Sequence, residues 1–303
     1  MKVQRGFTLI EMAIVLVIIT ILIGGLAMPL SAQIQARRIA ETKKTLEEAR
    51  EAIIGYAMNH IATVPATCTC IYKADTTLNI SDAPPDTLDD PDSTCPISLC
   101  PSTGTTTLTL PIARHFLPCP DLTQNDPEPD EDNDGDGNLS DLNNGREDRY
   151  KTGAIGTCAS RSGNLPWVTL STATQDAWGN RFLYAATYAY AASSTGFSNT
   201  DTGNHQICSA SGCATSTVVA TEVPVVVLSH GPNGWGALSV NGTTLQLPTS
   251  DDEKKNINAN FNFNFVSRTP SKAGDAAGEF DDLVVWISDG LLRSRVCPSG
   301  GCP

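Results

Sequence analysis

The sequence has only four histidines, and it lacks the motifs of several enzyme and cofactor classes. The histidines are scattered, and no grouping of cysteine and histidine has the spacing of a zinc site. No cysteine lies in a C-x-x-C-H sequence, which argues against covalently attached haem. A nucleophile and base at catalytic spacing and a metal-hydrolase motif are also missing, so we do not expect an enzyme.

Positive charge is scarce, because 20 basic residues stand against 33 acidic residues and give a net charge of −13. The excess is local: residues 121–148 contain eleven acidic residues and a single base, Arg146. Beyond residue 64, no cluster of lysine and arginine forms a basic stripe. We therefore expect no nucleic-acid partner.

Ten cysteines indicate an oxidising compartment and a set of disulfide bonds. Three pairs are separated by four intervening residues that include proline or glycine, so each pair can close a tight loop. These pairs are Cys95 with Cys100, Cys208 with Cys213, and Cys297 with Cys302.

The other four cysteines leave two arrangements open. Cys68 and Cys70 are too close in an extended chain to bond comfortably with each other. They can bond with Cys119 and Cys158, which flank the acidic region. Alternatively, Cys119 bonds with Cys158 and closes the acidic loop directly.

An apolar run near the amino terminus contains one charged residue. Residues 7–30 carry only Glu11, and Lys2 and Arg5 precede the run. As a helix, this run would be about 36 Å long, which is enough to cross a bilayer. The basic residues before it predict a cytoplasmic start and place the rest of the chain outside. Because an acid within a membrane is costly, Glu11 needs a partner.

Two simpler interpretations of the run explain less. A secretory signal peptide has a shorter apolar core, and no small-x-small cleavage site closes this one before Arg37. A plain single-pass anchor is long enough, but it gives no reason for Glu11.

The sequence from Gly6 to Glu11, GFTLIE, resembles the leader and processing site of type IV pilins and type II secretion pseudopilins. The resemblance implies that a prepilin peptidase cuts after Gly6 and that the new amino terminus, Phe7, is methylated. It also implies that Glu11 pairs with the terminal amine of a neighbouring subunit during filament assembly. The precursor would then cross the inner membrane once, with its head in the periplasm, before an inner-membrane platform assembles the filament.

The apolar periodicity continues beyond this run and predicts one helix from Phe7 to about Asn59. Gly24, Gly25 and Pro29 predict local bending or melting within it. After residue 64 the sequence is rich in turn residues, and strand-like segments come later. We predict an α+β type IV pilin fold, with an antiparallel sheet packed on the helix. The expected units are a leader (1–6), a transmembrane and filament-core helix (7–30), the second half of the helix (31–63), a loop-rich insert stapled by disulfides (64–164) and a β-sheet head (165–303).

Four segments have the composition of strands: NRFLYAATYAYA, TVVATEVPVVVLS, NINANFNFNFVS and FDDLVVWIS. Three short stretches resemble the head of the major pseudopilin of type II secretion systems. They are DAWGNRFLY (176–184), LSHGPNGWG (228–236) and DDLVVWIS (281–288). The long insert before Leu165 departs from that family.

The acidic loop has the chemistry of a cation site. Asp132, Asp134 and Asp136 alternate and Gly137 follows, which matches the start of an EF-hand loop. Alternate carboxylates can converge on calcium, with Asn138 as a further ligand and Asp141 closing the shell. The alternative is a solvated acidic turn without a cation. The resemblance also implies calcium in the carboxyl-terminal part of the head, where Asp281 and Asp282 are the nearby acids.

The sequence therefore predicts a structural subunit of a type IV pilus-like filament or of a type II secretion pseudopilus. An alternative is a minor pilin whose head is an adhesin or a substrate-binding module at the filament surface. The expected partners are other pilin subunits, the prepilin peptidase, the assembly platform and, before assembly, membrane lipid.

Overall fold

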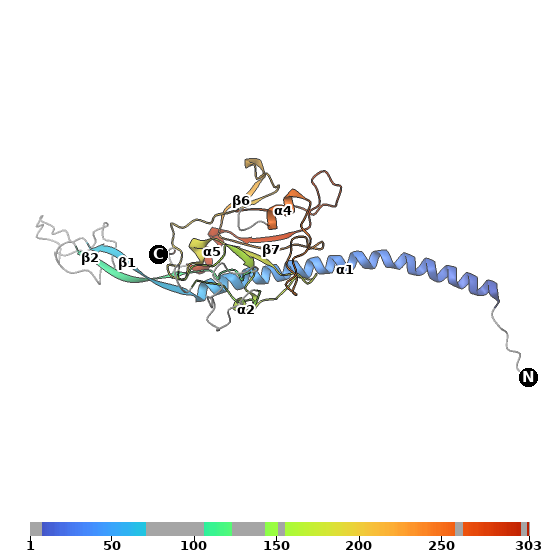
Figure 1. The fold of residues 1–303 in the computed structure, drawn as a ribbon, viewed down its shortest axis with the longest axis horizontal. Helices are drawn as coiled ribbons and strands as arrows, with labels where there is room; N and C mark the ends of the chain where they lie inside the picture. The colour runs from blue at the N-terminus through green and yellow to red at the C-terminus, as the bar shows by residue number, and fades with distance from the viewer. Residues whose placement is uncertain are drawn as a thin grey trace, which may run out of the picture.

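A single long helix forms the axis of the molecule in the computed structural model (Figure 1). The structure describes residues 8–70, 106–122, 143–150, 155–257, 263–297 and 302, without the side chains of residues 22–29, 70 and 106. The long helix enters the head about halfway along its length (Figure 1). Everything discussed below is positioned relative to this helix.

Helix α1 runs from Leu9 to Asn59 and has 51 residues, which corresponds to about 77 Å. Thr8 caps its first turn, because its side chain accepts a hydrogen bond from the backbone of Glu11 while the Glu11 side chain bonds the backbone of Thr8. The helix is continuous through residues 24–29, so the predicted melting at the glycines and the proline is wrong. Leu26, Ala27 and Met28 within this stretch are good helix formers.

Within the part of the chain that the structure describes, no helix is both long enough and apolar enough to cross a membrane. Phe7, the first residue of the predicted transmembrane helix, lies outside the described residues.

A two-stranded antiparallel ribbon follows α1 directly. It consists of β1 (Ile61–Cys70) and β2 (Thr106–His115), paired over ten positions from Ile61↔His115 to Cys70↔Thr106. The helix ends at Asn59, as predicted, and residues 61–63, which were assigned to the second half of the helix (31–63), form the start of a strand instead. Both strands are rich in threonine, and they include Val64 and Ile112, residue types that favour strands.

The central sheet contains four antiparallel strands in the order β3-β4-β7-β9. Their bounds are β3 Ser162–Asn164, β4 Leu183–Ala186, β7 Val225–Ser229 and β9 Leu283–Ile287. Strand β7 is buried along its whole length, which explains why it is an unbroken apolar run rather than an alternating one. The predicted antiparallel sheet on the second half of the helix is present.

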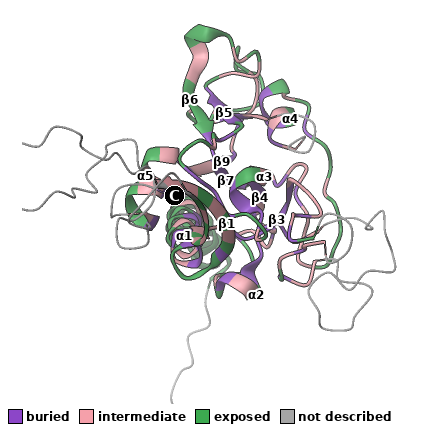
Figure 2. Cartoon of the chain, turned by 90° about the vertical axis from the view of Figure 1, so that its left-hand side faces the viewer, coloured by how far each residue is buried: buried purple, intermediate pink, exposed green. Residues whose placement is uncertain are grey.

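A second sheet covers the other face of the central one. It has the order β6-β5-β8, with β5 and β6 antiparallel and β5 and β8 parallel. Figure 2 shows β4, β7 and β9 between α1 and the β5–β6 layer. The bounds are β5 His205–Cys208, β6 Val218–Val223 and β8 Asn264–Val266.

The two faces of the central sheet bury two separate clusters. On the α1 side, Leu46, Ile53 and Ala57 pack in one cluster with Val225 and Val227. Alternate residues of the same strand, such as Val226 and Leu228, pack on the other side with residues of the second sheet. This alternation follows from the period of two in a strand.

Four short helices and a 3₁₀ turn complete the described fold. Their bounds are α2 Trp167–Leu170, α3 Tyr188–Ala191, α4 Asp251–Ile257, α5 Asp289–Val296 and η2 Thr215–Thr217. Helix α3 corrects the prediction of a strand over NRFLYAATYAYA, of which only Leu183–Ala186 is a strand. Of the predicted strand NINANFNFNFVS, the first two residues belong to α4 and only Asn264–Val266 form a described strand.

Candidate functional site

The amino-terminal part of α1 is an apolar rod that stands free of the described head (Figure 1). Leu9 is 89% exposed and Ile21 is 67% exposed, and the apolar side chains between them are exposed as well. A contiguous apolar surface of this kind indicates an interaction site. The rod therefore requires either lipid or other protein around it.

Glu11 lies in the first turn of this rod and is directed toward the start of the helix. Its Oε2 accepts hydrogen bonds from the backbone nitrogen and the hydroxyl of Thr8, both at 2.8 Å. Gly6 and Phe7, the predicted processing residues, lie outside the described residues. The carboxylate is thus exposed within one helical turn of the predicted new amino terminus.

The head holds α1 through a second set of contacts further along the helix. Nε1 of Trp178 donates to Oε1 of Gln35 at 3.3 Å, and the backbone nitrogen of Ala177 donates to the buried hydroxyl of Thr42 at 3.2 Å. From here to Ala57 the helix contributes to the core of the head. The free rod and the anchored half are therefore parts of one rigid element.

A cluster of three carboxylates is the candidate metal centre of the head. Glu253 comes from α4, and Asp281 and Asp282 come from the segment just before β9. One oxygen from each lies within 4.8 Å of the others. Two ligands of one calcium ion, each at about 2.4 Å, are separated by at most about 4.8 Å, so the spacing fits such an ion.

Each of these carboxylates has one oxygen bound and one oxygen without a hydrogen bond. Asn233 donates through its backbone to Asp281 at 3.1 Å and through its side chain to Glu253 at 3.1 Å, and Asn256 donates to Asp282 at 2.7 Å. The oxygens without a hydrogen-bond partner are Oε2 of Glu253, Oδ1 of Asp281 and Oδ1 of Asp282. Oδ1 of Asp282 lies 3.7 Å from Nδ1 of His230.

Burial makes these oxygens a strong indication of a ligand. Glu253 is 1% exposed and Asp282 is 4% exposed. Among the described residues, no lysine or arginine is ion-paired with the three acids; the neighbouring Arg268 bonds Asp252 instead. Buried polar groups normally have partners, so three grouped carboxylates, each with one oxygen that accepts no hydrogen bond, call for protons or a cation.

The raised pKa values in the cluster also favour a bound cation. Burial, with the nearby Asp282 carboxylate, raises the pKa of Glu253 to about 6. Burial, together with the neighbouring carboxylates of Glu253 and Asp282, raises the pKa of Asp281 to about 7. A hard cation with oxygen ligands would relieve this repulsion, because its charge favours the ionised carboxylates.

A tight glycine turn brings Asn233 to the cluster. Gly231 has a φ of 62°, and a Cβ there would lie 2.2 Å from the backbone oxygen of Asp281. Only glycine fits so close an approach of two backbones. The GPNGWG stretch therefore supplies hydrogen-bond donors to the acids through Asn233.

The predicted calcium residues of the acidic loop, Asp132, Asp134, Asp136, Asn138 and Asp141, lie outside the described residues. The two ends of that loop do meet in the structure. The backbone nitrogen of Asn143 donates to the oxygen of Leu122 at 2.9 Å, and that of Asn144 donates to the buried carboxylate of Asp121 at 3.2 Å. Burial raises the pKa of Asp121 to about 7.

Sequence reasoning named Asp281 and Asp282 only as acids near the turn, and it missed Glu253. The residues are far apart in sequence, and no spacing rule links them. The sequence feature that could have indicated Glu253 is the acidic run from Asp251 to Glu253, which begins a short helix. Only the packing of α4 against β8 brings Glu253 to the cluster.

Three disulfide bonds lie within the described residues: Cys119–Cys158, Cys208–Cys213 and Cys297–Cys302. The last two are the predicted local pairs. The first is one of the two arrangements that the sequence left open, and it closes the acidic loop. It also excludes the other arrangement, in which Cys68 and Cys70 bond with these two cysteines.

Cys68 is also disulfide-bonded. The predicted Cys95–Cys100 pair lies outside the described residues.

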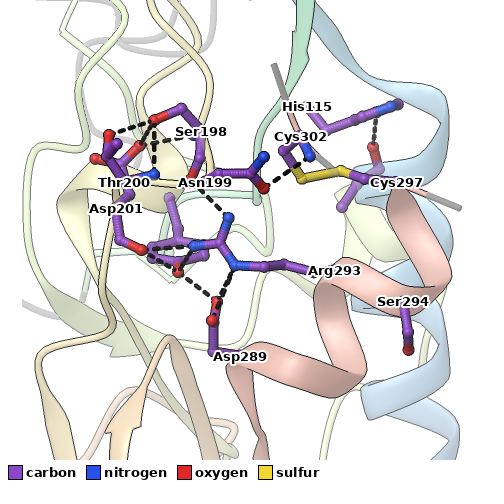
Figure 3. The surroundings of a disulfide bond; sticks show 12 residues. His115, Ser198, Asn199, Thr200, Asp201, Asp289, Arg293, Ser294, Cys297 and Cys302 are labelled. Carbon is purple, nitrogen blue, oxygen red and sulfur yellow. Dashed lines mark hydrogen bonds and ion pairs between the residues drawn. A yellow bond between two sulfur atoms is a disulfide. The ribbon is translucent and has the colours of Figure 1, made fainter. Parts of the chain in front are cut away.

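The Cys297–Cys302 bond fastens the carboxyl-terminal helix to the head (Figure 3). Asn199 accepts a hydrogen bond from the backbone nitrogen of Cys302 at 2.9 Å. Arg293 of α5 bonds Asp289 at 2.7 Å and the backbone oxygen of Ser198 at 2.6 Å. These contacts have a structural role, because every polar group involved has a partner within the chain.

Comparison with known proteins identifies the amino-terminal segment. Residues 1–27 match the family model described as the prokaryotic N-terminal methylation motif, which is the prepilin-type signal of type IV pilins and pseudopilins. No curated protein and no solved structure matches the chain. The matched segment includes Gly6, Phe7 and Glu11, and it ends well before the carboxylate cluster.

Proposed function

We propose that this chain, which carries the prepilin-type signal, is a structural subunit of a type IV pilus-like filament or of a type II secretion pseudopilus. The observation that supports it best is the position of Glu11, an acid inside the matched motif and at the exposed end of an apolar rod. A rod of this kind buries its surface most simply against identical rods, as in a filament core.

In the proposed mechanism, a prepilin peptidase cuts after Gly6 in the inner membrane and the amine of Phe7 becomes the methylated terminus. A carboxylate and an ammonium are each costly to place in an apolar environment alone, and their pairing offsets both costs. Glu11 of one subunit would therefore pair with the amine of a neighbour as the platform adds subunits. The head would lie in the periplasm before assembly and on the outside of the filament afterwards.

The identity of the mature amino terminus tests this proposal. Mass spectrometry of the chain purified from membranes should show a polypeptide that begins at Phe7 and carries one added methyl group. A chain that still begins at Met1 in cells with an active prepilin peptidase would exclude the proposal.

We also propose that the head holds one calcium ion through Glu253, Asp281 and Asp282. The support is that one oxygen of each carboxylate lies within 4.8 Å of the others, and that each carboxylate has one oxygen without a hydrogen-bond partner. Bound calcium would supply positive charge that ties α4 to the start of β9. The role is structural, since the three acids connect separate elements of the head.

The alternative of a minor pilin with an adhesive or substrate-binding head has less support. The buried carboxylates of Glu253, Asp281 and Asp282 in the described head suit a small cation as their ligand rather than a macromolecule. We therefore retain the structural role as the main proposal. Secretion assays beside imaging of surface filaments would separate a pseudopilus from a pilus.

A further inference from the structure

Where helix α1 runs along the head, it presents two charged side chains to the outside. Lys43 and Glu47 are exposed, whereas Leu46 and Ala49 from the same stretch of the helix are fully buried in the core of the head. The head therefore covers one side of α1 here and leaves the side with Lys43 and Glu47 open. Another subunit can reach this side of the helix.

Lys43 has no ion pair within the described part of the chain. A lysine and a glutamate four residues apart on one helix often pair with each other, and the adjacent Lys44 does so with Glu48 at 3.4 Å. Glu47 pairs instead with Arg50, whose Nη2 lies 2.8 Å from Oε2 of the glutamate. Because a carboxylate has two oxygens, each with more than one acceptor position, Glu47 can accept a second cation.

Glu47 lies on the same side of α1 as Glu11. It follows Glu11 by 36 residues, which is ten whole turns at about 3.6 residues per turn and about 54 Å along the axis. The helix is continuous between the two residues (Figure 1). Lys43 precedes Glu47 by four residues, as Phe7 precedes Glu11. Once Phe7 is the amino terminus, one side of the chain therefore carries the same arrangement twice: a positive group, followed after four residues by an acid.

The proposed pairing at the amino terminus fixes the offset between neighbouring helices. For the amine of Phe7 to meet Glu11 of a neighbour, two parallel helices must be displaced by four residues, or about 6 Å. The same displacement brings Lys43 of the first subunit level with Glu47 of the neighbour. We infer that these two residues form an ion pair between subunits in the filament. This inference rests on the proposed function, because its offset comes from the pairing of Glu11.

The effect of the second pair is on alignment rather than on the strength of assembly. An exposed ion pair contributes little free energy. The apolar rod of α1, however, can pack against a copy of itself at several offsets, because the hydrophobic effect is not directional. Two ion pairs about 54 Å apart on one side of the helix favour the four-residue offset over the others.

Carbodiimide crosslinking of purified filaments tests this inference. The reagent joins a lysine to a carboxylate that is in contact with it, and mass spectrometry should find an amide bond between Lys43 and Glu47. Filaments of Lys43→Arg alone or of Glu47→Gln alone should lose this product, although arginine keeps the charge. Filaments from cells that express both variants should regain it. Lys43 of one chain then meets Glu47 of the other, and neither chain can form the link internally.

Two results would overturn the inference and leave the proposed function standing. One is intact parental filaments in which the Lys43–Glu47 product does not form. The other is a product that forms in parental filaments but not in the mixed filaments, because the link would then lie within one chain. If the parent chain forms no filaments, the inference and the proposed function both fail.

A charge reversal gives a second measurement that does not depend on crosslinking. Lys43→Glu places two acids level with each other and should reduce filament numbers by about threefold, the scale of one exposed charge contact. Adding Glu47→Lys to this variant should restore the parental number. The matched control is Lys44→Glu, which lies about 100° around the helix from Lys43 and should assemble like the parent. All these chains should melt at the parental temperature in detergent, and parental filament numbers from Lys43→Glu would contradict the inference.

Discussion

Nδ1 of His230 lies 3.7 Å from Oδ1 of Asp282, and both side chains are buried. Among the described residues, His230 is the basic group that is ion-paired with the cluster of Glu253, Asp281 and Asp282. One histidine cannot balance three carboxylates. The cluster must therefore take up protons or a cation, and its effect on stability depends on both.

The first prediction concerns pH in the absence of calcium. Burial raises the pKa of Glu253 to about 6 and that of Asp281 to about 7, whereas both groups have an ordinary pKa of about 4 in an unfolded chain. At these two groups the folded chain binds more protons than the unfolded chain, so their contribution to stability falls as pH rises through these values. Asp121 acts in the same direction, and His205, whose pKa is lowered by burial to about 4, acts in the opposite direction. With EDTA present, the melting temperature of the detergent-solubilised chain should be lower at about pH 8 than at about pH 5.

Glu253→Gln serves as the matched control for this pH dependence, because it keeps the shape of the side chain and removes one titrating group. The decrease in melting temperature should become smaller in this variant. A parent chain that becomes more stable between the same two pH values would contradict the prediction.

The second prediction concerns calcium at neutral pH. A site with a Kd of about 10⁻⁴ M, at about 1 mM calcium, stabilises a fold by about 1.4 kcal/mol. For a chain of this size, that is a rise in melting temperature of about 2 °C. Glu253→Gln should abolish the rise, and magnesium should not replace calcium, because it demands a smaller octahedral shell.

Asp134→Ala separates the two calcium hypotheses. If the carboxylate cluster is the site, this variant in the acidic loop should show the parental response to calcium. A response that is lost in Asp134→Ala and kept in Glu253→Gln would instead assign the ion to the acidic loop.

The third prediction compares two disulfide bonds. Cys119–Cys158 spans a sequence separation of 39 and Cys208–Cys213 a separation of 5. Loop-closure entropy therefore assigns about 4 kcal/mol to the first bond and about 2 kcal/mol to the second. Replacement of both cysteines by serine should lower the free energy of unfolding more for the Cys119–Cys158 pair. Equal losses in denaturant titrations would show that loop closure is not the main contribution.

Elements with a strong periodic pattern were predictable from the sequence. The apolar run and its continuation gave α1 to Asn59, and the apolar segments around Val227 and Val285 gave two strands of the central sheet. In these segments the local preference and the tertiary packing agree.

The β1–β2 ribbon was not predictable, because Pro65 and Pro111 argue against a strand and the two strands are separated by more than thirty residues. Helix α3 was missed for a different reason. Its aromatic residues favour a strand locally, but burial of Tyr190 in the core decides its conformation. The candidate metal centre depends on such tertiary contacts, so the sequence indicated two of its acids and not Glu253.

The fourth prediction concerns filament assembly and the charge of Glu11. Glu11→Gln keeps a side chain that can accept the hydrogen bonds from Thr8, so the cap of α1 should persist. It removes the negative charge that would pair with the terminal amine of a neighbour. Unpaired charges in an apolar core cost several kcal/mol, so filament numbers in electron micrographs should fall by more than about tenfold.

Glu48→Gln is the control for this substitution, because Glu48 lies on the same helix in an exposed ion pair with Lys44 at 3.4 Å. Exposed pairs contribute about 0–1 kcal/mol, so this variant should assemble like the parent. Both variants should be processed to begin at Phe7, which separates a failure of assembly from a failure of cleavage. Normal filaments from Glu11→Gln would show that charge pairing does not drive the polymer, and the rod would then assemble through apolar packing alone.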